Sequence, residues 1–122
     1  MDTISIANKL VELNRAHRYD EIFDTLYAPN AVSVEAATMP GMDREAKGVA
    51  AIKAKGEWWA NNHEIHSITI SGPWPHDDRF VVGFGMDVTH KPSGQRIQMD
   101  EVGLYTVKNG KVVREEFFYN AG

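Results

Sequence analysis

The sequence of 122 residues contains no cysteine, which excludes disulfide bonds, thiolate metal ligands and a cysteine nucleophile. Positive charge is also scarce. The 13 lysines and arginines are outnumbered by 17 aspartates and glutamates, they form no basic block, and the formal net charge is −4. Because nucleic-acid binding by counterion release needs a basic surface, we expect no nucleic-acid partner.

Long apolar runs and cofactor motifs are missing as well. No stretch approaches the about 18 apolar residues needed to cross a bilayer. The segment Met1–Asn8 carries neither a basic region nor a long apolar one, so we expect no signal peptide. The simplest expectation is a cytoplasmic protein with no membrane partner. No glycine-rich phosphate loop, nucleophile elbow or zinc motif is present, which predicts no cofactor.

The composition is otherwise that of an ordinary globular domain, with 43% hydrophobic and 25% charged residues. The length suits a single domain over residues 1–122. Apolar residues at helical spacing predict three helices, one through Ile6, Leu10 and Leu13, a second over 19–27 and a third over 49–61. Pro29 ends the second helix, because proline cannot continue the backbone ladder.

Between and after these helices the pattern predicts strands. The β-branched stretch 31–36 predicts a first strand, and residues 38–48 predict a loop over the mouth of a pocket. From Glu64 onward apolar residues recur at every second position, which predicts strands over 64–70, 80–88, 97–107 and 111–120. The segment 72–78 breaks the first of these, and turns at 91–94 and 108–110 separate the others. Helices that cap the concave face of a curved antiparallel sheet define an α+β domain.

This order of elements, over nearly the whole chain, resembles the nuclear-transport-factor-2-like superfamily, which includes ketosteroid isomerases and SnoaL-type polyketide cyclases. The pieces that carry the resemblance are Tyr27–Val32 (YAPNAV), Gly48 at the start of the third helix, and Tyr105–Val113 (YTVKNGKVV). The resemblance implies a cone-shaped domain that encloses one pocket. It does not assign a reaction, because the superfamily also holds hydrolases, dehydratases and non-catalytic binding modules.

The two predicted hairpins determine which residues share a face of the sheet. The turn at 91–94 sets Phe84 near Glu101 and Met86 near Met99. A three-residue loop at 108–110 pairs Glu101 with Phe117, whereas a two-residue loop would shift that register by one. The predicted pocket face is apolar except for two glutamates, and consists of Phe80, Val82, Phe84, Met86, Met99, Glu101, Tyr105, Val113, Glu115, Phe117 and Tyr119.

Glutamates among apolar side chains are candidates for acid–base chemistry. Burial raises the pKa of a carboxyl, and a second carboxylate nearby raises it further. The resemblance to ketosteroid isomerase puts Glu35 at the general-base position and Glu101 at, or next to, the acid that stabilises the enolate oxygen. Both positions are aspartate in that enzyme, and its helix-1 tyrosine corresponds to Leu10 here. We therefore expect a proton transfer other than steroid isomerisation. The alternative is that these glutamates are solvated surface residues.

Aromatic and histidine side chains complete the expected ligand site. Trp59, on the stripe of the third helix, is expected to form a pocket wall, Tyr119 to donate a hydrogen bond to a ligand, and His66 to enter beside Phe84. Packing in the core without ligand contact is the alternative for both aromatic residues. The pair His63 and His66 straddles a helix end, and on a strand the two point to opposite faces, so we expect no metal site.

The outer face of the predicted sheet carries an apolar patch of Val102, Leu104, Val112 and Phe118. A patch of this size predicts burial against a second copy of the chain, and the resemblance also implies homodimers packed through their sheets. The alternative is that the C-terminal tail or a loop covers it.

Three functions remain open from the sequence. The first is a cofactor-independent isomerase, cyclase or lyase that acts on a small apolar molecule, in which Glu35 takes a proton and neutral Glu101 stabilises an oxygen. The second is a non-catalytic module that binds a hydrophobic ligand, with Glu101 and Glu115 held by Tyr119 or by backbone donors. The third is a dimeric interaction domain whose pocket is too small for a ligand.

Overall fold

The three predicted helices are present in the computed structural model, which describes residues 1–37, 41 and 43–120. They are α1 (Thr3–Arg15), α2 (Tyr19–Leu26) and α3 (Val49–Asn62). The side chain of Asp2 caps α1 by accepting a hydrogen bond of 2.8 Å from the backbone N–H of Ser5. Within the described residues, none of the helices is both long enough and apolar enough to cross a membrane.

Six strands form one mixed, unclosed sheet in the order β2-β1-β6-β5-β4-β3. They are β1 (Tyr27–Val34), β2 (Glu45–Lys47), β3 (His63–His76), β4 (Arg79–His90), β5 (Gln95–Lys108) and β6 (Lys111–Phe118). The predicted α+β class is confirmed. The expectation of a wholly antiparallel sheet is corrected, because β1 and β6 run parallel. Between β1 and β6 the chain passes through β2, α3 and three further strands, and β6 then lies beside β1 in the same direction.

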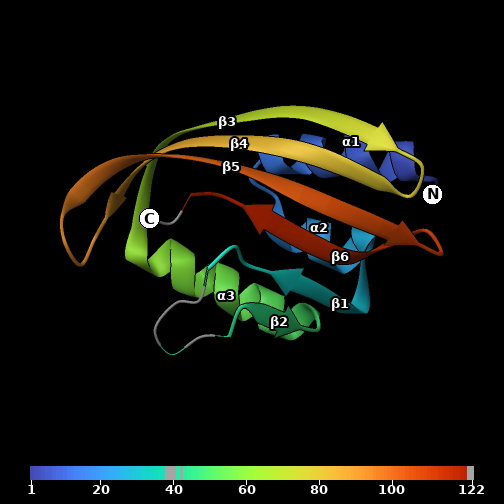
Figure 1. Ribbon diagram of the computed structural model, residues 1–122, viewed down its shortest axis with the longest axis horizontal. Helices are drawn as coiled ribbons and strands as arrows, with labels where there is room; N and C mark the ends of the chain where they lie inside the picture. The colour runs from blue at the N-terminus through green and yellow to red at the C-terminus, as the bar shows by residue number, and fades with distance from the viewer. Residues whose placement is uncertain (38–40, 42, 121–122) are drawn as a thin grey trace.

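The helices cover one face of the sheet. In Figure 1, α1 and α2 lie behind the strands and α3 lies beside β1 and β2. We call the face that packs against the helices the inner face and the opposite one the outer face. The core joins helix residues to the inner face, and its members include Ile6, Leu10, Leu13, Ile22, Leu26, Tyr27, Ile52, Ile70, Phe80, Val82, Tyr105, Val107 and Val112.

Strand boundaries differ from the prediction at three places. β1 spans 27–34 instead of 31–36, and residues 45–47 of the predicted loop form β2 against β1. Residues 38–40 and 42 of that loop lie outside the described residues. The expected break at 72–78 is wrong, since β3 continues to His76. A bulge between Ser71 and Trp74 takes up Gly72 and Pro73, which leaves the proline, with no N–H to donate, outside the ladder.

One predicted register is confirmed and the other is wrong. The β4–β5 pairing sets Phe84 opposite Glu101 and Met86 opposite Met99, as expected. The β5–β6 hairpin instead has a two-residue turn, in which Asn109 (φ 53°) and Gly110 (φ 75°) are both left-handed. The register then shifts between Thr106 and Val107, so Gly103, not Glu101, lies opposite Phe117.

This register changes two assignments to faces of the sheet. Val112 was expected on the outer face, but it pairs with Val107 and is fully buried in the core. Val113 was expected opposite Tyr105, but it is the extra residue of the bulge, and Glu115 takes that place opposite Tyr105.

Candidate active site

The three candidate glutamates come from different elements and meet around one lysine on the inner side of the sheet. Glu35 directly follows β1, Glu101 lies on β5, and Glu115 lies on β6. The lysine is Lys55 of α3, whose ammonium opposes the raised pKa of both Glu101 and Glu115 and forms an ion pair with Glu35. We call these four residues the carboxyl–lysine cluster.

Glu35 is held on both carboxylate oxygens. Lys55 Nζ lies 2.7 Å from Glu35 Oε1, and both side chains are largely buried, with 14% and 17% exposed. The Tyr119 hydroxyl donates a hydrogen bond of 2.8 Å to Glu35 Oε2. Lys55 also stands over the ring of Phe117, with Nζ 5.4 Å from the ring centroid. Tyr119, which was expected to donate a hydrogen bond to a ligand, therefore donates it to Glu35.

Glu115 is the most deeply buried member of the cluster. It is 4% exposed, and the parallel β1–β6 register sets it beside Ser33, which is 0% exposed. Burial raises the pKa of Glu115 to about 7, while the charge of Lys55 and hydrogen bonds from Tyr27 and Ser33 act against that rise. In the part of the chain that the structure describes, no buried side-chain nitrogen or oxygen lacks a hydrogen-bond partner.

Glu101 lies on the inner face opposite Phe84, and its pKa is raised to about 7. Burial is the largest cause, the negative charge of Glu35 adds to it, and Lys55 opposes it. Tyr105 separates Glu101 from Glu115, and its pKa is raised by burial and by the charges of both glutamates. The charge of Glu35 thus reaches Glu101 and adds to the effect of burial on its pKa.

The apolar residues expected at the site divide into two groups. Met86 is buried opposite Met99, and Phe84 and Phe117 pack against the core, all on the inner face. Trp59 lies toward the C-terminal end of α3, where its indole stacks on His63 with ring centroids 4.3 Å apart. Its described contacts are with that end of the helix.

His66 does not lie beside Phe84, because Ile70 occupies the position opposite Phe84 on β3. The register of β3 shifts between Ile65 and Ser67, which sets His66 at a bulge. Its side chain is exposed, and Nε2 lies 2.7 Å from Thr89 Oγ1. The expectation that His66 enters the pocket assumed an unbroken alternation along this strand.

Sequence reasoning missed Lys55 and Ser33. The signal for Lys55 was its position between Ile52 and Trp59, at helical spacings of three and four residues, which puts a charged side chain on the inward stripe of α3. Ser33 gave no comparable signal, because its importance depends on the pairing of β1 with β6, two strands far apart in the sequence.

An open groove of about 420 Å³ lies elsewhere, along the outer face of β3, β4 and β5. Phe84 and Glu101 border it, and the other residues that line it are Ser67, Thr69, Ser71, Gly83, Gly85, Asp87, Gln98 and Asp100. It is open and mostly polar, unlike the enclosed apolar pocket that the sequence predicted. We regard the carboxyl–lysine cluster as the candidate site, because two carboxyls with raised pKa values and a buried lysine meet there.

A helix-capped mixed sheet with ionisable groups on its inner face defines a nuclear-transport-factor-2-like domain. The sequence profile of the SnoaL-like domain matches residues 1–119, and the chain belongs to that family. No protein with curated annotation matches the sequence.

Solved structures agree with this assignment. A protein of Mesorhizobium loti, named provisionally as a SnoaL-like polyketide cyclase, is 39% identical, with a TM-score of 0.91 over 98% of this chain and 100% of its own. TerC, crystallised with polyporic acid, is 20% identical, with a TM-score of 0.73 over 97% of this chain and 91% of its own. A hypothetical protein of Catenulispora acidiphila with a ketosteroid-isomerase-like fold, in complex with trimethylamine, is 16% identical, with a TM-score of 0.66 over 82% of this chain and 73% of its own. The last two likenesses concern the fold alone.

Proposed function

We propose that the protein is a small cofactor-independent enzyme, of the isomerase, cyclase or lyase type, that transfers a proton on a mainly apolar metabolite. The observation that carries the proposal is the pair of Glu35 and Glu101. Glu35 is ion-paired with Lys55, and Glu101, close to it, has a pKa raised to about 7. At neutral pH an ion-paired carboxylate then lies near a carboxyl that is protonated in a large fraction of the molecules, which is an arrangement that suits general acid–base catalysis.

The two glutamates take different parts in the proposed reaction. Glu35 accepts a proton from a carbon next to a carbonyl group. Glu101, in its neutral form, donates a hydrogen bond to the carbonyl oxygen as that oxygen gains negative charge. Burial, and then the charge of Glu35, raise the pKa of Glu101, so the ionised base adds to the burial that favours the acid form of its partner. Protonated Glu35 then returns its proton to a carbon of the product, which restores its carboxylate, and Glu101 keeps its own proton throughout.

The surroundings of the pair favour an apolar ligand. Phe84, Met86, Met99 and Phe117 share the inner face with Glu101, so hydrocarbon surface borders the ionisable groups. The crystal structures of TerC with polyporic acid and of the Catenulispora acidiphila protein with trimethylamine support a fold that accommodates small molecules. Ligand pockets in proteins generally combine apolar walls with a few placed polar groups, and the inner face offers both.

The test uses a panel of hydrophobic cyclic ketones in D₂O, with deuterium incorporation at the α carbon followed by NMR. We expect incorporation above the buffer rate, and a loss of about 10²-fold or more in Glu35→Gln and in Glu101→Gln. Glu57→Gln, on the exposed surface of α3, is the matched control and should keep the wild-type rate. Wild-type rates in both cluster variants would contradict the proposal.

A ligand-binding module without turnover is the second candidate. The observation that favours it is that both oxygens of Glu35 already have partners, Lys55 and Tyr119, as expected of a structural carboxylate. Titration of the glutamate carboxyls by ¹³C NMR separates the two functions. An inflection of Glu101 near pH 7 supports the enzyme, whereas an ordinary value near that of a solvated glutamate supports the binding module.

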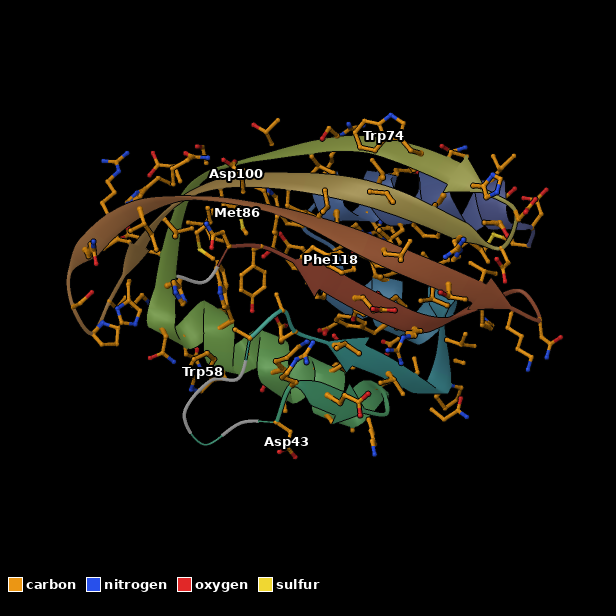
Figure 2. All side chains as sticks on the ribbon, in the orientation of Figure 1. Asp43, Trp58, Trp74, Met86, Asp100 and Phe118 are labelled. Carbon is orange, nitrogen blue, oxygen red and sulfur yellow. The ribbon has the colours of Figure 1, made fainter. Side chains whose placement is uncertain are left out.

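We also propose that the protein forms a homodimer through the outer face of the sheet. Val102 and Phe118 pair across β5 and β6 and are 38% and 50% exposed, and Trp74 on β3 is 56% exposed. Figure 2 shows Trp74 on β3 and Phe118 at the end of β6. We expect a dimer in analytical ultracentrifugation and a monomer for Phe118→Lys. Trp58, 41% exposed on α3, provides the control Trp58→Lys, which should remain dimeric. A monomeric wild type would refute the interface.

A further inference from the structure

The proposed chemistry gives no role to Glu115, although this residue is 4% exposed at the centre of the sheet. Its strand, β6, lies between β1 and β5, and the register sets Glu115 beside Ser33 and opposite Tyr105. An ionisable group in this position is unfavourable unless it is neutral or well hydrogen-bonded. The hydrogen bonds that hold Glu115 therefore connect its protonation state to the residues that make them.

The hydroxyl of Ser33 connects Glu115 to Lys55. Lys55 Nζ donates a hydrogen bond to Ser33 Oγ. A hydroxyl accepts on its lone pairs and has a single proton to donate. Because Oγ accepts from Lys55, its proton is directed to Glu115, with which Ser33 shares a hydrogen bond. Lys55 Nζ also lies 2.7 Å from Glu35 Oε1. One ammonium therefore contacts Glu35 directly and Glu115 through one hydroxyl.

We propose that Glu115 is a positioning residue that tunes the basicity of Glu35 through Ser33 and Lys55. When Glu115 is ionised, its charge draws the ammonium toward Ser33 and weakens the ion pair with Glu35. When Glu115 is protonated, the ammonium rests on Glu35. Glu35 is the stronger base in the first state, because less positive charge offsets its own. The inference rests on the proposed function, and it adds a second ionisation that regulates the same site.

The groups that face Glu115 leave few other charges to respond. Tyr27 of β1 and Tyr105 of β5 contact it, and burial raises the pKa of both phenols well above their ordinary value, so they stay neutral. Lys55 of α3 and, beyond it, Glu35 are the charged groups that act on Glu115, while Glu101 lies on the far side of Tyr105. A change in the protonation of Glu115 thus acts first on the position of the Lys55 ammonium.

The test is a ¹³C NMR titration of the glutamate side-chain carboxyls in the full-length protein. Glu101 has a pKa in the same range as Glu115, so Glu101→Gln is the starting protein. We expect the carboxyl signal of Glu35 to show an inflection near pH 7, where Glu115 changes its charge. That inflection should be lost in the double variant with Glu115→Gln and reduced or lost in the double variant with Ser33→Ala. Its absence from Glu101→Gln, or its persistence after Glu115→Gln, would overturn the proposal.

A second measurement does not depend on folding of the Glu115 variant. In Glu101→Gln alone, the ¹⁵N signal of Lys55 Nζ should move as the pH passes 7, and a constant signal would also overturn the proposal. A purely structural role for Glu115 would lower the melting temperature of its variant and leave the Glu35 inflection unchanged. Neither measurement uses turnover, so a failed exchange assay refutes the enzyme and a failed titration refutes the coupling.

Discussion

The substitution Glu101→Gln is expected to stabilise the protein at alkaline pH and to have little electrostatic effect at acidic pH. Burial, and then the charge of Glu35, raise the pKa of Glu101 from 4.5 to about 7. A carboxyl whose folded pKa exceeds its unfolded value binds more protons in the folded state between those two values. The contribution of Glu101 to stability is therefore fully present below pH 4.5 and is lost as the pH rises through 7.

The magnitude follows from the distance between the two values. The difference between 4.5 and about 7 amounts to about 3 kcal/mol, at roughly 1.4 kcal/mol per pKa unit. Glutamine has a similar shape and no charge to bury. The Glu101→Gln variant should therefore not lose stability between pH 4.5 and about 7 through ionisation of this side chain. The unfolding free energy of the variant, minus that of the wild type, should rise by about 3 kcal/mol between pH 4.5 and pH 8.

Urea unfolding measured at four pH values between 4.5 and 8 gives this difference by linear extrapolation. Ionisable groups that do not interact with Glu101 contribute equally to both proteins and cancel. The control is Glu57→Gln, which removes a carboxyl from an exposed position on α3, where no charge is buried. A constant difference for Glu101→Gln would show that this carboxyl titrates like a solvated one. The reasoning from burial, and with it the acid role of Glu101, would then be wrong.

Two further predictions concern packing and charge. Gly103→Ala should destabilise the fold by about 1–3 kcal/mol, because a Cβ there would lie 2.8 and 3.1 Å from atoms of two aromatic rings. Gly56→Ala, whose Cβ would meet no atom of the described residues within 4 Å, should stabilise α3 by about 0.5–1 kcal/mol; urea unfolding checks both. Lys55→Met should raise the pKa of both Glu101 and Glu115 above about 7 in a ¹³C titration, since the ammonium lowers each of them. Lys55→Arg, which keeps the charge, should have a smaller effect.

The sequence predicted local elements well and long-range pairing only in part. The β4–β5 register followed from strict alternation on both sides of a clear turn. At the β5–β6 hairpin, a two-residue turn moved the pairing by one position and the bulge moved it by one more. Val112, between the two shifts, changed face. Glu115, after both, returned to the predicted face with a different neighbour, Tyr105 in place of Gly103.

The candidate site was predicted as a set of glutamates, without the lysine and the serine that contact them. Alternation on β5 and β6, and the resemblance, placed three glutamates near one another. The partners that determine their protonation come from other elements, Lys55 from α3 and Ser33 from β1. Nothing in a single sequence specifies that these two elements meet β6, because such contacts depend on how the layers pack. The alternation that misplaced His66 failed for a related reason, a bulge that local propensity does not reveal.

The composition of the carboxyl–lysine cluster itself argues for chemistry. Three carboxylates and one ammonium would leave a net charge of −2 in a largely buried setting, and two of the glutamates accordingly have pKa values of about 7. A domain that only had to fold would gain from apolar residues here, since replacing buried ion pairs by packed hydrophobic groups is often neutral or stabilising. At neutral pH the cluster exists in more than one protonation state. A site that must take up a proton and return it needs this property, and a purely structural core does not.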